Sequence, residues 1–338
     1  MTLYYYRPVA RFGEVPTLQS FPLAGGLCWF DTVAVHQRGG GVQMMAAGDI
    51  PSDVLDLLVR PRAPISGMAM TAPQIMGILN VTPDSFSDGG QFNAPEAALD
   101  RALAMQTDGA AIIDIGGEST RPGAATVSVS DEITRTAPVI AAIRAQSAVP
   151  ISIDTRKSTV GTAALDAGAT MVNDVAAFTF DPALAQVAAD ANVPICIMHA
   201  QGSPETMQND PQYDDVLLDV YDFLAERIAA AVAAGIPKDQ IVVDPGIGFG
   251  KTLEHNLILL RGIAIFHALG CPILLGASRK RFIGTIGGGQ DASDRLGGSV
   301  AIALFGARRG VQILRVHDIF ATKQALDLEW AIGGAAMT

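Results

Sequence analysis

The feature that most constrains the fold of this chain is an alternation of short apolar runs with longer amphipathic stretches, which begins near residue 72. The runs are rich in β-branched residues, are often preceded by Pro or Gly, and are too short for independent helices, so we expect strands. The eight expected strands cover residues 75–80, 111–116, 149–154, 170–174, 193–199, 241–246, 273–278 and 311–317. Helical patterns lie between and after them, for example at residues 94–108, 132–146, 158–167, 215–234, 253–269, 294–309 and 319–332.

Eight strands that are each followed by a helix match the size of a (β/α)8 TIM barrel. A doubly wound parallel sheet is the alternative, because alternation alone does not close a barrel. We predict an α/β protein in which residues 72–338 form a (β/α)8 barrel, the catalytic domain, after an N-terminal extension at residues 1–71. The extension has a short helical candidate at residues 52–59 but no alternation, and its role is unknown.

Residues typical of helix ends accompany this pattern. Asp131 and Thr155 stand where N-terminal caps are expected, and Gly168, Gly235 and Gly270 fall where helices should stop.

Composition and charge exclude several classes of protein. The chain is 49% hydrophobic and 17% charged, which argues against disorder. Its formal net charge of −11 makes nucleic acid or an anionic membrane an unsuitable main partner. The three cysteines are far apart and spell no zinc or redox pair, so we expect buried thiols in a reducing compartment. Without a signal peptide or an apolar run of about 18 residues, we expect a soluble, cytoplasmic protein.

Polar residues stand at the carboxyl end of nearly every expected strand. In a barrel these side chains face the mouth of the active site. Acids and amides come from the middle strands (Asp154, Asn173, Asp244), and cations come from strands seven and eight (Arg279, Lys280, Arg315). One such Asp could be a turn or a helix cap, but the whole set predicts a small ligand with a polar ring and a phosphate.

Three glycine-rich segments follow strands one, two and six. The loops at residues 80–90 and 116–123 are rich in Ser, Pro and Gly, and a solvated turn is the alternative to a functional loop. The segment from Asp244 to Thr252 is not a P-loop, because the glycine required five residues before Gly250 is Pro245. Its glycines should instead let the backbone or Phe249 approach a flat ligand.

Taken in order, these segments resemble the dihydropteroate synthase family of pterin-binding enzymes, from about Gln74 to Leu328. The resemblance is carried by residues 80–90, 117–123, 152–155, 173–175, 198–199, 244–251, 276–280 and 315–318. It implies a barrel that condenses 6-hydroxymethyl-7,8-dihydropterin diphosphate with p-aminobenzoate, giving 7,8-dihydropteroate and pyrophosphate. The extension before residue 72 departs from the family pattern.

The resemblance also implies roles for individual residues. The pterin ring would be held by Asp154, Asn173, Asp244 and Lys280, and lined by Met198 and Phe249. The diphosphate would meet Asn80, Arg315 and His317, with Asn80 also ligating Mg2+. Gly276 and Ser278 would contribute to substrate binding, the latter near p-aminobenzoate. The residues implied in catalysis are Asp84, Thr120, Arg121, Asp244, Lys280, Arg315 and His317; Thr120 and Arg121 belong to a loop that also helps close the p-aminobenzoate pocket.

In the family, cleavage of the C–O bond is thought to lead, leaving a cation delocalised into the dihydropterin. The main catalytic task would then be stabilisation of the leaving diphosphate. Two alternatives stay open: a pterin-domain methyltransferase, which has no use for a diphosphate site, and a non-catalytic pterin-binding paralogue. The resemblance further implies a homodimer.

Overall fold

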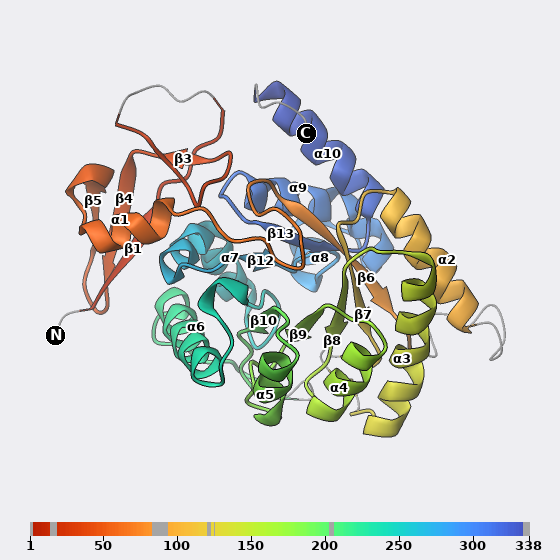
Figure 1. Cartoon of the computed structure of the whole chain (residues 1–338). Coiled ribbons are helices and arrows are strands. Elements are labelled where there is room, and N and C mark those ends of the chain that lie inside the picture. The colour runs from red at the N-terminus through yellow and green to blue at the C-terminus, as the bar shows by residue number, and fades with distance from the viewer. Residues whose placement is uncertain are drawn as a thin grey trace.

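The structure is a computed structural model that describes residues 3–13, 19–82, 94–119, 123–124, 126–202 and 206–333. Its centre is a barrel of eight parallel strands (Figure 1). They are β6 (Gln74–Asn80), β7 (Ile112–Gly116), β8 (Ile151–Asp154), β9 (Met171–Asp174), β10 (Ile195–Met198), β11 (Ile241–Asp244), β12 (Leu274–Leu275) and β13 (Ile313–Val316). Neighbours in the sheet follow chain order, β13 pairs with β6, and a parallel bridge from Val243 to Ile273 closes the ring. The (β/α)8 prediction is therefore confirmed, and the doubly wound sheet is excluded.

Helices cover the outside of the barrel (Figure 1). They are α2 (Ala94–Thr107), α3 (Val129–Gln146), α4 (Ser158–Asp166), α5 (Ala183–Asp190), α6 (Val216–Ala233), α7 (Leu253–Gly262), α8 (Arg281–Gly287), α9 (Leu296–Ala307) and α10 (Ile319–Ile332), with the 3-10 segments η3 (Lys238–Gln240), η4 (Ile263–Leu269) and η5 (Ala292–Arg295). Side chains of β7, β8, β9, β10 and β11 are buried at every position. Because these strands are covered on both faces, most of their residues are apolar, and their polar residues lie mainly toward the carboxyl ends.

The predicted elements agree with the structure better in their centres than at their ends. Several strands stop before their predicted ends, at Asp244, Leu275 and Val316. The cap predictions were wrong for Asp131 and Thr155. Ser128 caps α3 by accepting from the Asp131 amide, and Thr155 donates to Glu132 Oε1 instead of capping α4. Gly168, Gly235 and Gly270 do follow helices with positive φ, as predicted.

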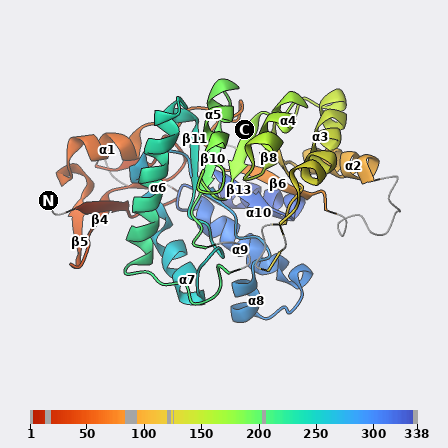
Figure 2. The ribbon, with the colours of Figure 1, turned by 90° about the horizontal axis from the view of Figure 1, so that it is seen from below.

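The extension is built mainly from a three-stranded antiparallel sheet. Its strands are β1 (Tyr4–Pro8), β4 (Thr32–Gln37) and β5 (Val42–Ala46), accompanied by the short pair β2 (Phe21–Pro22) and β3 (Trp29–Phe30), the 3-10 turn η1 (Ala47–Asp49) and helix α1 (Ser52–Val59). The helix was predicted, whereas the sheet was not, because β4 is buried on both faces and lacks alternation. The sheet lies beside α6 (Figure 2), where Tyr5 donates to Asp222 and Arg38 pairs with Asp219.

The segment that joins the extension to the barrel fills the amino end of the barrel. Ile65, Met68 and Met70 belong to one buried cluster with barrel residues such as Met76 and Ile112. Residues from both sides of position 71 therefore share one core.

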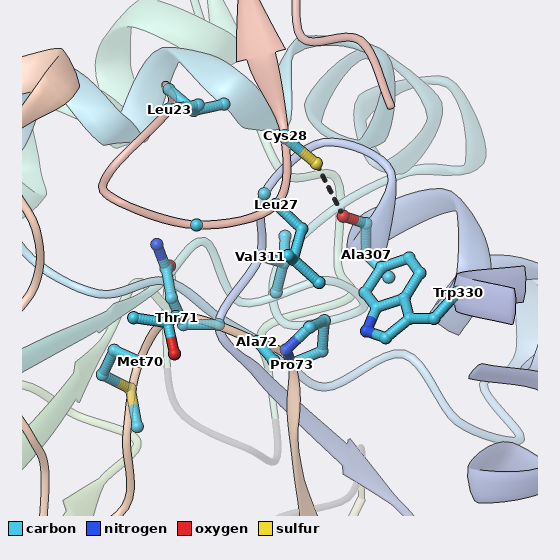
Figure 3. A pocket seen from close by; sticks show the side chains of 13 residues that line it. Leu23, Leu27, Cys28, Met70, Thr71, Ala72, Pro73, Ala307, Val311 and Trp330 are labelled. Atoms are coloured by element: carbon cyan, nitrogen blue, oxygen red, sulfur yellow. Dashed lines mark hydrogen bonds between the residues drawn. The ribbon is translucent and has the colours of Figure 1, made fainter. Parts of the chain in front are cut away.

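A small hollow lies beside this junction, at the amino ends of β6 and β13 (Figure 3). It is lined largely by apolar groups, including Leu27, Pro73 and Trp330, and the Cys28 thiol at its edge donates to the Ala307 carbonyl oxygen. Burial raises the pKa of that thiol to about 12. The hollow therefore offers no reactive group, and it lies at the opposite end of the barrel from the polar residues.

Two further expectations can be compared with the structure. All three cysteines are buried and free, as predicted. Within the described ranges, we find no helix with the length and apolar character needed to cross a membrane.

Candidate active site

Residues from seven of the eight strands, or from the loops directly after them, meet at the carboxyl end of the barrel. Eleven of the predicted residues lie there: Asn80, Asp154, Asn173, Met198, Asp244, Phe249, Gly276, Ser278, Lys280, Arg315 and His317. Asp154, Asn173, Met198, Asp244 and Ser278 are buried, while the others are half-buried. Asp84, Thr120 and Arg121 lie outside the described residues.

Arg315 is held at the centre of this group by two carboxylates. Its Nε donates to Asp114 Oδ2 at 2.6 Å and its Nη2 to Asp154 Oδ2 at 2.7 Å. The Asn173 amide also donates to Asp114, at 3.3 Å. Asp114 is fully buried on β7, and it was not among the predicted site residues. Its role is to orient both the cation and the amide.

Asp154 has one carboxylate oxygen that nothing in the described part of the chain satisfies. Oδ2 receives Arg315, whereas Oδ1 is buried and has no hydrogen-bond partner. Burial raises the pKa of Asp154 to about 7, with Arg315 opposing the shift and Asp114 adding to it. A buried acceptor without a donor costs about 1–3 kcal/mol, so this atom is suited to an N–H group of a ligand.

Asp244 lies between Arg315 and Lys280. Its Oδ1 accepts from the Gly246 amide at 2.7 Å, and a Cβ placed on Gly276 would lie 3.5 Å from its Oδ2. Burial raises the pKa of Asp244, while the Gly246 amide, Lys280 and Arg315 lower it. The same Cβ on Gly276 would lie 3.8 Å from the Arg315 Cδ. Gly276 therefore lies beside both charged groups.

Phe249 and Lys280 form the other side of the site. The Lys280 ammonium lies 3.9 Å from the centre of the Phe249 ring, a cation–π contact. Gly248 has φ +84°, and a Cβ there would lie 3.1 Å from the Lys280 side chain. Glycine at this position therefore permits the close approach of the Lys280 side chain to the loop.

The residues after β12 and β13 are linked to one another. Ser278 Oγ lies 3.1 Å from His317 Nδ1 and accepts from the His317 amide at 3.3 Å. Arg279, the third cation predicted from strands seven and eight, forms an ion pair of its own. Its guanidinium donates to Asp318 through Nε at 2.9 Å and through Nη2, so its charge is already paired.

Two groups of buried polar residues near the mouth were missed by sequence reasoning. Lys251 Nζ lies 2.9 Å from His199 Nδ1 and donates to the Phe249 carbonyl oxygen at 2.9 Å. Burial lowers the pKa of His199 to about 2, so its ring is neutral. Only the polarity of His199 at a strand end signalled this pair; nothing in the sequence joins it to Lys251.

The second group supports the end of β7. Lys157 Nζ donates to Glu132 Oε2 at 2.7 Å and lies 3.3 Å from Glu118 Oε1, while Glu118 Oε2 accepts from Arg156 at 2.9 Å. All four residues are buried. They come from three different elements, so their pairing follows from the barrel and not from local sequence.

Asn80 is the residue that was expected to ligate Mg2+. It ends β6, and a Cβ placed on the neighbouring Gly116 would lie 3.7 Å from both Asn80 Oδ1 and Asp154 Oδ2. No group of three or more His, Cys, Asp or Glu suited to a metal occurs among the described residues. A single amide oxygen fits Mg2+ that takes its other ligands from a diphosphate and water, because this ion is often bound by few protein groups.

Comparison with known proteins identifies the family. The model of the family described as "Pterin binding enzyme" matches residues 76–317. The dihydropteroate synthase of Synechocystis sp. is 48% identical over 250 residues, which cover 74% of this chain and 86% of that protein. The Escherichia coli K12 enzyme is 46% identical over 261 residues, covering 77% and 92%.

Solved structures agree with this result. The Xanthomonas albilineans dihydropteroate synthase with 4-aminobenzoic acid has a TM-score of 0.77 and 46% identity, and the match covers 82% of this chain and 99% of that chain. The same organism's enzyme in complex with 7,8-dihydropteroate has a TM-score of 0.74 and 43% identity, with 82% and 100% covered. This chain belongs to the pterin-binding enzyme family and, within it, to the dihydropteroate synthases.

Proposed function

We propose that the mouth of the barrel condenses 6-hydroxymethyl-7,8-dihydropterin diphosphate with p-aminobenzoate, releasing pyrophosphate and 7,8-dihydropteroate. The main support for this reaction is Oδ1 of Asp154, which has no hydrogen-bond partner among the described residues. This carboxylate lies in one hydrogen-bonded group with Asn173, Asp114 and Arg315. An aminopyrimidinone edge has N–H donors for a carboxylate and acceptors for an amide. Related enzymes solved with 4-aminobenzoic acid and with 7,8-dihydropteroate support the same acceptor and the same product.

The two faces of the ring would be bounded by side chains from different loops. Phe249 with Lys280 would lie on one side of the ring, and Met198, next to Gly246, on the other. A Cβ on Gly246 would lie 3.2 Å from Met198 Cγ and 1.9 Å from the His199 carbonyl oxygen. The ionised carboxylate of Asp244 would stabilise positive charge on the pterin as the C–O bond breaks.

The leaving diphosphate would meet Arg315 and His317, with the Ser278 hydroxyl holding the His317 ring. Arg315 is already paired with Asp114 and Asp154, so its charge is partly offset. Asn80 would supply the protein ligand for Mg2+, which, when bound, supplies positive charge to the diphosphate. Asp84, Thr120 and Arg121 remain candidates from the family resemblance for the loops above the site.

A direct assay tests the proposal and separates it from the two alternatives. Given both substrates and Mg2+, the chain should release pyrophosphate in step with formation of dihydropteroate. A methyltransferase or a non-catalytic pterin-binding protein would bind a pterin without releasing pyrophosphate. Lys280→Ala should lower kcat/KM, whereas the exposed neighbour Arg281 gives a matched control, because Arg281→Ala removes a cation outside the site.

We also propose that the chain forms a homodimer through α9 and α10. Large apolar side chains are exposed on these packed helices: Leu296 on α9, and Phe320, Leu328 and Ile332 on α10. Phe320, Leu328 and Ile332 lie on one face of α10, since they are separated by multiples of four residues. Light scattering should give the mass of a dimer for the parent and a smaller mass for Phe320→Asp.

We also propose a cytoplasmic location for the protein. The three free thiols are in keeping with a reducing compartment.

A further inference from the structure

Lys251 is a buried lysine, and among the described residues no carboxylate is one of its hydrogen-bond partners. Its side chain is directed back from the loop after β11 toward the end of β10. Nζ lies 2.9 Å from His199 Nδ1, 3.3 Å from the His199 carbonyl oxygen and 2.9 Å from the Phe249 carbonyl oxygen. The His199 amide still donates to the Asp244 carbonyl oxygen at 3.0 Å, and beyond this last strand hydrogen bond the Lys251 amino group joins His199 to the loop after β11.

The residues that Lys251 joins are next to the expected pterin contacts. His199 directly follows Met198, and Phe249 carries the ring that lies beneath Lys280. The His199 ring is itself fixed, because it packs edge-on against Phe223 with 4.8 Å between ring centres. Lys251 thus connects the Phe249 backbone to a residue that cannot easily shift.

Other contacts also hold the loop after β11 in place. The Tyr213 hydroxyl donates to the Gly250 carbonyl oxygen at 2.7 Å, and Asn256 Oδ1 accepts from the Gly248 amide at 2.6 Å. A Cβ on Gly250 would lie only 2.5 Å from the Gln201 carbonyl oxygen. The loop after β11 is therefore fitted closely onto the loop after β10, with Lys251 as its buried link.

We propose that Lys251 is a positioning residue that sets the separation between Met198 and Phe249, and so the width of the slot for a flat bicyclic ring. Lys251 does not touch the substrate in this account; it acts through His199 and Phe249. The inference rests on the proposed function, because it takes the slot as the pterin site. It assigns Lys251 to recognition of the ring and not of the diphosphate.

The test compares two ligand classes that share only part of the site. Calorimetry measures binding of 6-hydroxymethylpterin, which has the ring alone, and of inorganic pyrophosphate with Mg2+. Lys251→Met should weaken binding of the ring by about tenfold or more, because small misplacements of site residues have large effects. Pyrophosphate binding should stay within about threefold of the parent, a difference of less than 0.7 kcal/mol at 25 °C.

Two variants and a control complete the experiment. Lys251→Gln keeps two N–H donors and should restore part of the ring affinity. Tyr213→Phe removes the single hydrogen bond to the Gly250 carbonyl oxygen and should weaken ring binding by severalfold. This variant keeps the test decisive if Lys251→Met fails to fold. Lys323→Met is the control, since this exposed lysine pairs with Asp327 far from the mouth.

Each outcome has a distinct meaning. Folded Lys251→Met or Tyr213→Phe protein that binds the ring as tightly as the parent would overturn the inference. Equal loss of ring and pyrophosphate affinity would do the same, because it would show general damage to the site. Failure of the proposed function would appear in the parent, as absence of both ring binding and pyrophosphate release.

Discussion

The guanidinium of Arg315 lies against the fully buried carboxylate of Asp114, with 2.6 Å between Arg315 Nε and Asp114 Oδ2. The same guanidinium pairs with Asp154 at 2.7 Å. A cation that would meet the diphosphate is thus also the counter-ion of two carboxylates in the barrel mouth. Diphosphate binding and folding therefore both depend on Arg315, so its substitution should affect activity and stability together.

Arg315→Ala should abolish pyrophosphate release and also lower the free energy of unfolding. Leaving a buried charge without its partner typically costs about 3–5 kcal/mol. Urea unfolding followed by circular dichroism measures the second effect. The double variant Arg315→Ala with Asp114→Asn is the control, because it removes one of the charges left unpaired and should recover part of the stability. An Arg315→Ala protein that unfolds at the urea concentration of the parent would contradict this account.

Asp154 should make pterin binding depend on pH. Burial raises the pKa of this carboxyl to about 7, so the protonated form becomes dominant as the pH falls below that value. A protonated carboxyl has lost acceptor capacity for the N–H groups of the ring, and affinity should fall with it. Calorimetry with 6-hydroxymethylpterin between about pH 6 and pH 8.5 would measure the change across this pKa. Asp154→Asn should bind more weakly but with a flatter pH profile.

The raised pKa of Asp154 also predicts the direction in which the free energy of unfolding changes with pH. An unfolded Asp has a pKa of about 3.9, so between that value and about 7 the folded chain binds more protons at this site than the unfolded chain. The contribution of Asp154 to the free energy of unfolding should therefore decrease as the pH rises through this window. Asp154→Asn should remove that slope, and an unchanged slope would show that Asp154 stays ionised throughout.

Lys157→Met should destabilise the chain strongly because it leaves Glu132, which is fully buried, without its cation. The expected loss is about 3–5 kcal/mol in urea unfolding. Adding Glu132→Gln should restore part of it, since both charges are then removed. A matched surface control is Lys323→Met, whose pair with Asp327 is exposed and should contribute less than about 1 kcal/mol.

How far the sequence predicts this molecule depends on the range of the interactions involved. The barrel was predictable because each strand and helix carries its own period and its own turn residues, and the polar ends of parallel strands must meet at one edge. The pairing of Arg279 with Asp318, and of Lys251 with His199, was not predictable. These partners are separated by 39 and 52 residues, and their contact depends on the closed barrel.

The extension shows the same limit. Its helix at Ser52–Val59 was predicted from local pattern, whereas the sheet was not, because Val33, Ala34 and Val35 are all buried. One face of β4 packs with α1 residues such as Leu58, and the neighbouring strand β1 contacts η4. Alternation is lost where a strand is covered on both sides, and only the packing against the barrel explains it.

Truncation tests where the extension ends. Deleting residues 1–71 should damage folding, because Ile65, Met68 and Met70 fill the amino end of the barrel beside Met76 and Ile112. Removing one large buried apolar side chain typically costs about 2–5 kcal/mol, and this deletion removes three from that cluster alone. Deletion of residues 1–59 keeps these three and should be milder.

The shorter deletion should still have a measurable effect. It removes Leu58 and the sheet that covers η4, and so exposes Ala268 and the region around Tyr221. We therefore expect the 1–59 deletion to fold with a lower unfolding midpoint and to bind 6-hydroxymethylpterin with nearly the parent's affinity, because every site residue lies at the opposite end of the barrel. The 1–71 deletion should be insoluble or lack a cooperative transition. Equal stability of the two deletions would show that residues 60–71 do not support the barrel, and loss of pterin binding by a folded 1–59 deletion would show that the extension contributes to the site.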